Sequence, residues 1–203
     1  MPGMKDTLKA VSIDLFHKKG YFATSISDIA RAAGIQKSSI YYHYATKEDI
    51  LFDILSTTLA DLNATLQNAL ENVQGAENRM RAAILSHTIF HLERQKEVII
   101  SDSELRGLTA KTHKTIIKQR DEYEQKFQAL IKAGMEQRVF RKADYKIISY
   151  AIITMCTSVC WWYRPQGRLD QKPIAEIYTD FIMTGLKGRD EKAVVKRVRK
   201  GRR

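Results

Sequence analysis

Apolar side chains recur three or four residues apart along almost the whole chain, which is the spacing of one face of an α-helix. Residues 4–19 illustrate the pattern, with Leu8, Val11 and Leu15 on one face and charged residues between them. Residues that interrupt helices are scarce, since the 203 residues include only 3 prolines and 10 glycines. The chain is therefore predicted to be all-α, with about nine helices.

Two short helices separated by a glycine follow the first helix. Ser25 and Asp28 have the spacing of a capping box and predict a helix over residues 26–33. Gly34 supplies the left-handed conformation that ends this helix, and a second helix follows over residues 38–44. Two short helices joined by such a tight turn form a helix-turn-helix, whose second helix enters the major groove of DNA.

The second short helix has the composition expected of a recognition helix. Polar side chains surround Ile40, which is expected to pack on the first helix. Tyr44 is assigned to packing, while Tyr41 and Tyr42 are assigned to the DNA side, with burial in the core as the alternative. The predicted contacts to DNA in this segment are Lys37, Ser38, Ser39, Tyr41, Tyr42 and His43.

Residues that flank the two helices are candidates for phosphate contacts. Thr24 and Ser25 precede the first helix, where hydroxyl and backbone N–H groups can bind a phosphate. Lys47 opens the next long helix and is placed for another contact. The alternative for Ser25 and Thr46 is that they only cap their helices, although capping does not exclude phosphate contact.

Three segments carry a resemblance to a known family: residues 20–24 (GYFAT), 29–35 (IARAAGI) and 37–44 (KSSIYYHY), followed by Lys47 and Leu51. Through them, residues 8–55 resemble the N-terminal domain of TetR-family regulators. The resemblance implies a helical C-terminal domain that dimerises and holds a small ligand. It also implies a dimer on a near-palindromic operator, usually a repressor that ligand releases. Carried over by position, the DNA contacts are Thr24, Ser38, Tyr41, Tyr42, His43 and Lys47.

The predicted organisation has three parts: a DNA-binding domain over residues 1–50, an effector-binding and dimerisation domain over 51–187, and a basic tail over 188–203. A net charge of +11 suits a polyanionic partner. However, the tail holds eight Lys or Arg and two acids, so it contributes +6 of that charge. The tail is expected to be a disordered, solvated end that can add non-specific phosphate affinity; a role at a membrane surface is the alternative.

Segments of the effector domain resemble a narrower group. The pattern ELRGL…RDEY within residues 104–123, with WWYRP at 161–165, is similar to TetR-family regulators that respond to acyl-CoA thioesters in fatty-acid or steroid breakdown. Such an effector needs an apolar tunnel and cations for its phosphates, and residues 144–163 are the candidate wall. The candidate effector contacts are Arg106, Arg120, Tyr123, Trp161, Trp162 and Arg164.

Each of these contacts has a structural alternative. The tryptophans can be core or dimer-interface residues, and Arg164 can interact only with the helix dipole. Arg106 and Arg120 can instead pair with Glu104 or Asp121. The effector itself has an alternative, a lipophilic or cationic drug that controls an efflux system, whose pocket would contain buried acids and aromatic rings.

Dimerisation is expected to use residues 144–187, because an apolar helix over 144–163 cannot bury its whole circumference in one small bundle. The segment 174–186 adds an apolar stripe, so two helices per subunit would form a four-helix interface. Two-fold symmetry then places the recognition helices roughly 34–36 Å apart, one turn of DNA.

Other function classes find little support in the sequence. No nucleophile with a base, no metal-ligand spacing and no phosphate loop is recognisable; His87 and His91 lack the glutamate of a metalloprotease motif. The uncharged run of residues 147–163 would form a helix of about 25 Å, which is short for a bilayer. Cys156 and Cys160 are expected to be buried reduced thiols in a cytoplasmic protein without metal or secretion signal.

Overall fold

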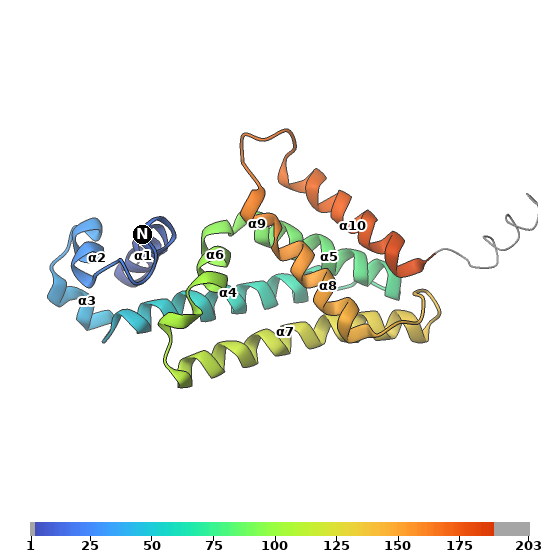
Figure 1. Ribbon diagram of the computed structural model, residues 1–203, viewed down its shortest axis with the longest axis horizontal. Helices are drawn as coiled ribbons and strands as arrows, with labels where there is room; N and C mark the ends of the chain where they lie inside the picture. The colour runs from blue at the N-terminus through green and yellow to red at the C-terminus, as the bar shows by residue number, and fades with distance from the viewer. Residues whose placement is uncertain (1–2, 189–203) are drawn as a thin grey trace, which may run out of the picture.

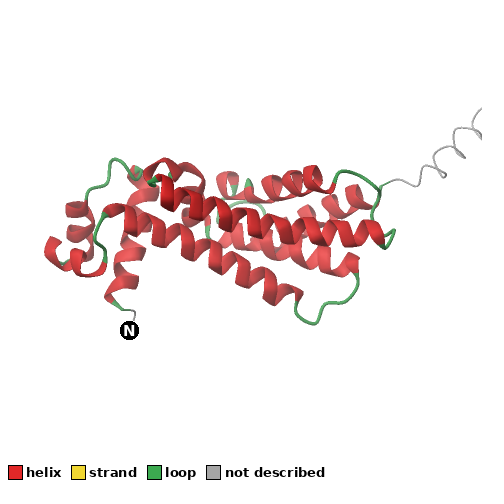
Figure 2. Ribbon diagram, turned by 90° about the horizontal axis from the view of Figure 1, so that it is seen from below, coloured by secondary structure: helices red, strands yellow, loops and turns green. Residues whose placement is uncertain are grey.

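The computed structural model describes residues 3–188, so all but the first residue of the predicted basic tail lies outside the described residues. Within this range every regular element is helical, and the all-α prediction is confirmed (Figures 1 and 2). No helix among the described residues is long and apolar enough to cross a membrane.

Three helices form the end of the molecule drawn in blue in Figure 1: α1 (Met4–Lys19), α2 (Ile26–Ala33) and α3 (Lys37–His43). Their contact is apolar, with Phe16, Ile29 and Ile40 almost completely buried. Gly34 has a φ of 68°, the left-handed conformation that ends α2 as predicted. The helix-turn-helix is therefore held at a fixed angle by a small core.

The helix α4 (Lys47–Leu70) starts at this unit and runs into a bundle with α5 (Ala76–Glu93), α7 (Ala110–Glu136) and α8 (Tyr145–Thr157), as Figure 1 shows. Large apolar side chains such as Leu55, Ile84 and Phe127 are completely buried in the bundle. The helix α4 therefore connects the helix-turn-helix unit directly to the bundle.

The remaining helices are α6 (Gln95–Ser103), which a 3-10 turn η1 (Leu105–Gly107) follows, α9 (Val159–Trp162) and α10 (Gln171–Lys187). The prediction of one continuous helix over 144–163 was wrong, because α8 ends at Thr157 and α9 begins at Val159. At the break, the Ser158 hydroxyl donates to the Met155 carbonyl at 2.8 Å. A local side-chain bond of this kind competes with the helical backbone pattern.

Cys156 and Cys160 are both free and buried, as predicted. Burial raises the pKa of each thiol to about 11. The thiols are thus protonated at neutral pH and act as small apolar side chains.

Candidate DNA-binding surface and effector cavity

The exposed face of α3 is polar and aromatic. Tyr42 is 87 % exposed and Tyr41 is 49 % exposed, whereas Ile40 on the same helix is fully buried. Lys37, Ser38 and Ser39 are also exposed, and His43 is half-buried. The burial of Tyr44, 4 % exposed, confirms its assignment to packing; its hydroxyl donates to Asp53 at 2.6 Å.

Ser25 caps α2 reciprocally with Asp28. The Ser25 hydroxyl accepts from the Asp28 backbone N–H at 3.1 Å, and the Asp28 carboxylate accepts from the Ser25 N–H at 3.0 Å. The hydroxyl also donates to this carboxylate, which lowers the Asp28 pKa. The cap is confirmed, and the phosphate contact of Ser25 stays a prediction.

The Thr24 side chain differs from expectation. It is only 1 % exposed, and its hydroxyl donates to the Gly20 carbonyl at 2.8 Å. The turn between α1 and α2 therefore uses the hydroxyl that was expected to face a phosphate.

Lys47 ties α4 to that same turn. Its ammonium group donates to the carbonyls of Tyr21 at 2.9 Å and Thr24 at 2.7 Å. It also lies 4.3 Å from the centroid of the Tyr21 ring. Partial burial lowers the Lys47 pKa. Lys47 thus has a structural role that the sequence did not indicate.

The effector domain contacts the same region through η1. A Cβ atom on Gly107 would lie 2.6 Å from carbon atoms of the Tyr21 ring and 2.8 Å from Leu51. Nearby, the Glu48 carboxylate accepts from the Thr109 N–H at 2.9 Å and from the Thr112 hydroxyl at 2.6 Å. The start of α4 is therefore fixed to both the helix-turn-helix and the start of α7.

A cavity of about 190 Å³ lies between α4, α5, α6, α7 and α8. Residues 144–163 were predicted as a cavity wall, and α8 does line this one. The lining also includes two of the six candidate effector residues, Arg120 and Tyr123. The full set is Thr58, Leu59, Leu62, His87, Phe90, His91, Val98, Ser101, Asp102, Arg120, Asp121, Tyr123, Glu124, Tyr150, Ile153, Thr154 and Thr157.

Arg120 joins α7 to the end of α6. It donates to the Ser101 carbonyl at 2.7 Å and to the Asp102 carboxylate at 3.3 Å. Ion pairing, the alternative for this residue, is thus present, but with Asp102 rather than Glu104 or Asp121. Burial raises the Asp102 pKa although Arg120 opposes the shift.

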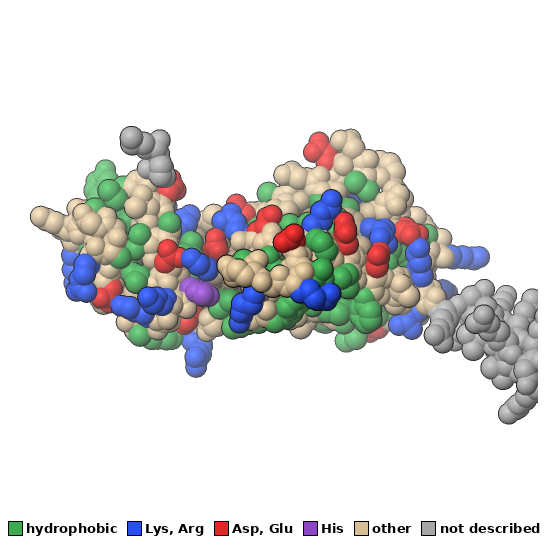
Figure 3. Space-filling view, turned by 90° about the horizontal axis from the view of Figure 1, so that it is seen from above, with side chains coloured by type: hydrophobic (Ala, Val, Ile, Leu, Met, Phe, Trp, Pro, Cys, Tyr) green, Lys and Arg blue, Asp and Glu red, His purple; other side chains and the backbone are tan. Residues whose placement is uncertain are grey.

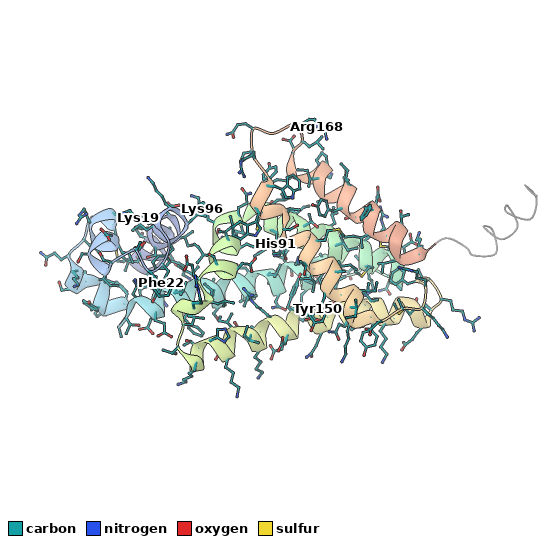
Figure 4. All side chains as sticks on the ribbon, viewed as in Figure 1. Lys19, Phe22, His91, Lys96, Tyr150 and Arg168 are labelled. Carbon is teal, nitrogen blue, oxygen red and sulfur yellow. The ribbon has the colours of Figure 1, made fainter. Side chains whose placement is uncertain are left out.

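The other four candidates lie elsewhere, which corrects the expectation of one shared site. Arg106 is exposed on η1, and Trp161 is half-exposed on α9. Trp162 stacks on Tyr178, and Arg164 donates to the Tyr163 carbonyl at 3.0 Å beside the end of α9. Trp162 and Arg164 line a second cavity of about 390 Å³ under the loop that carries Arg168, which Figure 4 labels at the top.

Two buried histidines complete the first cavity and were not among the predicted contacts. Figure 4 labels His91 in the interior of the bundle. His87 Nδ1 lies 2.8 Å from the Tyr123 hydroxyl, and both rings lie 3.3 Å from the Thr157 hydroxyl. Their spacing of four residues on α5 was the available signal. Among the described residues, no three His, Cys, Asp or Glu side chains gather to hold a metal ion.

Comparison with protein families identifies both parts of the chain. Residues 10–54 match the family described as bacterial regulatory proteins, tetR family, and residues 73–186 match the tetracyclin repressor-like C-terminal domain. The chain belongs to the TetR family. It is a DNA-binding transcriptional regulator with a helix-turn-helix, and the family is not one of enzymes.

Several similar proteins are transcriptional regulators. The HTH-type transcriptional repressor KstR2 of Rhodococcus jostii is 26 % identical over 188 residues, 91 % of each chain. The structure of PfmR from Thermus thermophilus, a TetR-family regulator, has 30 % identity and a TM-score of 0.82, with 90 % of this chain and 98 % of that one covered. AibR in complex with isovaleryl coenzyme A and operator DNA has 23 % identity and a TM-score of 0.81, with 88 % and 97 % covered.

Proposed function

We propose that this TetR-family regulator is a cytoplasmic homodimeric repressor that binds a near-palindromic operator and is released by an acyl-CoA thioester of lipid catabolism. Ser25, Lys37, Ser38, Ser39, Tyr41, Tyr42 and His43 are the proposed contacts to DNA, with Lys47 supporting them. The exposed rings and hydroxyls on α3 favour this assignment, because base edges and phosphates are read by such groups.

The observation that carries the effector proposal is the cavity between α4 and α8, with Arg120 at its lining. The similar AibR forms a complex with isovaleryl coenzyme A, and the similar KstR2 is a ketosteroid transcriptional regulator. A volume of about 190 Å³ suits a compact acyl group and not a whole CoA, whose nucleotide would remain outside.

Release from DNA tests this proposal. A labelled operator fragment bound to the protein is titrated with a panel of CoA thioesters, and fluorescence anisotropy reports dissociation. We expect one class of thioester to release the DNA and free CoA to be much weaker. No release by any member of the panel would contradict the acyl-CoA effector. Native mass spectrometry of freshly purified protein is the complementary measurement.

A second effector class has a specific observation in its favour. Three carboxylates, of Asp102, Asp121 and Glu124, line the same cavity as the one guanidinium group of Arg120. An excess of acids attracts cations and repels phosphates. Release of DNA by a lipophilic amine, and not by thioesters, would identify the protein as the drug-responsive repressor of an efflux system.

The dimer is proposed to form through α8 and α10. Ile147, Ile177 and Phe181 are exposed on these helices, and a groove of about 650 Å³ lies between them. Figure 3 shows hydrophobic side chains, with Lys and Arg among them, on the effector-domain half of one face. Exposed apolar side chains of this number favour association through a two-fold interface.

A further inference from the structure

The hydrogen-bonding direction of the buried histidines can be derived from their partners. His91 Nδ1 lies 2.8 Å from the His87 backbone carbonyl, which can only accept. His91 Nδ1 therefore carries a proton. Burial lowers the His91 pKa to about 4, so the ring is neutral and its Nε2 has no proton.

The protonation of His91 determines which atoms donate and which accept at Thr157 and His87. Thr157 Oγ1 lies 3.3 Å from His91 Nε2 and 3.3 Å from His87 Nε2. Since His91 Nε2 is an acceptor, the Thr157 hydroxyl donates its one proton there and accepts from His87 Nε2–H. Burial lowers the His87 pKa, so this ring is neutral as well and its Nδ1 accepts from the Tyr123 hydroxyl at 2.8 Å.

The result is a directed chain from Tyr123 through His87 and Thr157 to His91, in which each proton has an acceptor. All four side chains line the cavity. The oxygens of Tyr123 and Thr157 have a free lone pair each, but no free proton. If Tyr123 turned its proton towards a ligand, His87 Nδ1 would lose its donor. If His87 then changed tautomer to donate to Tyr123, Thr157 would have to donate to His87 Nε2, and His91 Nε2 would lose its donor.

We infer that the inner end of the cavity selects a ligand that carries a hydroxyl group on a compact apolar body, and disfavours the corresponding ketone. A hydroxyl can donate its one proton to the Tyr123 oxygen or to the Thr157 oxygen, whereas a carbonyl can only accept. The Ser101 hydroxyl, in a residue 6 % exposed, lines the same cavity and has no hydrogen-bond partner among the described residues. It can donate to the ligand's oxygen.

This inference rests on the proposed effector cavity, and it specifies the group that the cavity binds. An acyl thioester whose compact acyl part bears a hydroxyl at its far end would supply both the apolar body and the hydroxyl group. The expected preference for the alcohol over the ketone is about tenfold, the size of one net hydrogen bond.

Ligand-observed NMR titration of the full-length protein tests the preference with 4-tert-butylcyclohexanol and 4-tert-butylcyclohexanone. We expect the alcohol to bind about tenfold more tightly. Thr157→Val removes the link that orients His87, so the preference should fall below about threefold. Thr154→Val makes the same change at a cavity position that does not belong to the hydrogen-bonded series. This variant should retain the preference for the alcohol. Melting temperatures check that both variants fold.

Equal or tighter binding of the ketone, or a preference unchanged by Thr157→Val, would overturn the inference, as would binding of neither probe. Nitrogen-15 NMR of the histidine rings gives an independent reading, because protons on His87 Nε2 and His91 Nδ1 are expected. The opposite tautomer at either ring would contradict the assigned directions of the hydrogen bonds. DNA release by CoA thioesters is measured separately, so failure of that proposal leaves these readings unaffected.

Discussion

The ammonium group of Lys47 lies 4.3 Å from the centroid of the Tyr21 ring while it donates to the carbonyls of Tyr21 and Thr24. These contacts join the first residue of α4 to the turn that precedes α2. Lys47 therefore positions the helix-turn-helix relative to the long helix that enters the effector domain.

Replacement of Lys47 by methionine should lower both stability and operator affinity. The variant loses two hydrogen bonds and a cation–π contact, and we expect the free energy of unfolding to fall by about 1 to 2 kcal/mol. Chemical denaturation and anisotropy measure the two effects. Lys37→Met, at an exposed position on α3, is the control and should leave stability unchanged. Lys47→Met with unchanged stability would contradict the structural role.

Tyr42→Ala should weaken operator binding by at least about tenfold without changing the melting temperature, because the side chain is 87 % exposed. Tyr42→Phe keeps the ring and separates stacking from hydroxyl contact. The same anisotropy assay measures both variants. Wild-type affinity in Tyr42→Ala would remove this residue from the DNA contacts.

Gly107→Ala should destabilise the protein by about 1 to 3 kcal/mol, because the new methyl group overlaps the Tyr21 ring and Leu51. We also expect altered operator affinity, since Tyr21 contacts Lys47. Arg106→Ala, at the exposed neighbouring position, is the matched control for urea denaturation. Equal stability of the two variants would show that the turn moves away without cost.

Phe181→Glu should convert the dimer to monomers. It replaces an apolar side chain, 70 % exposed on α10, by a charged one that the proposed interface would have to bury. Gln125→Glu makes the same charge change on the exposed face of α7 and should leave the mass unchanged. Light scattering coupled to size-exclusion chromatography measures the molar mass of both variants. Operator affinity should fall with Phe181→Glu, since two joined recognition helices are needed. A dimeric Phe181→Glu variant would move the interface elsewhere.

Stability should fall as the pH decreases from about 6.5 towards 4. The pKa of His91 is about 4 in the folded protein, below its ordinary value of 6.5, so the unfolded chain binds the proton first. Between pH 7 and 5 the expected loss is about 2 kcal/mol, and burial of His87 adds to it in the same direction. Urea denaturation at both pH values measures the loss. His91→Gln should reduce the pH dependence, whereas His113→Gln, at an exposed position, should retain it.

Much of the DNA-binding end could be predicted because its determinants are local. The capping box at Ser25, the left-handed Gly34 and the burial of Ile40 follow from spacing within a few residues. The roles of Thr24 and Lys47 could not be predicted, since their partners are backbone carbonyls whose positions depend on how α1 and α4 meet.

The effector contacts were harder to predict for a related reason. Arg120 and Trp162 belong to motifs that resemble one subgroup, but helix packing places them at different cavities. The pattern of four residues between His87 and His91 indicated a shared face of α5. Only the tertiary structure brings Tyr123 and Thr157 against that face.

The close packing of Gly107 on Tyr21 has a consequence for protein engineering. A regulator with a new operator could be made by joining the helix-turn-helix unit of one protein to the remainder of another. Such a junction would separate Tyr21 from Gly107 and pair each with a foreign surface. A chimera should therefore transfer residues 101–112 together with the helix-turn-helix unit. Without them, we expect the chimera to bind the new operator but not to respond to the effector.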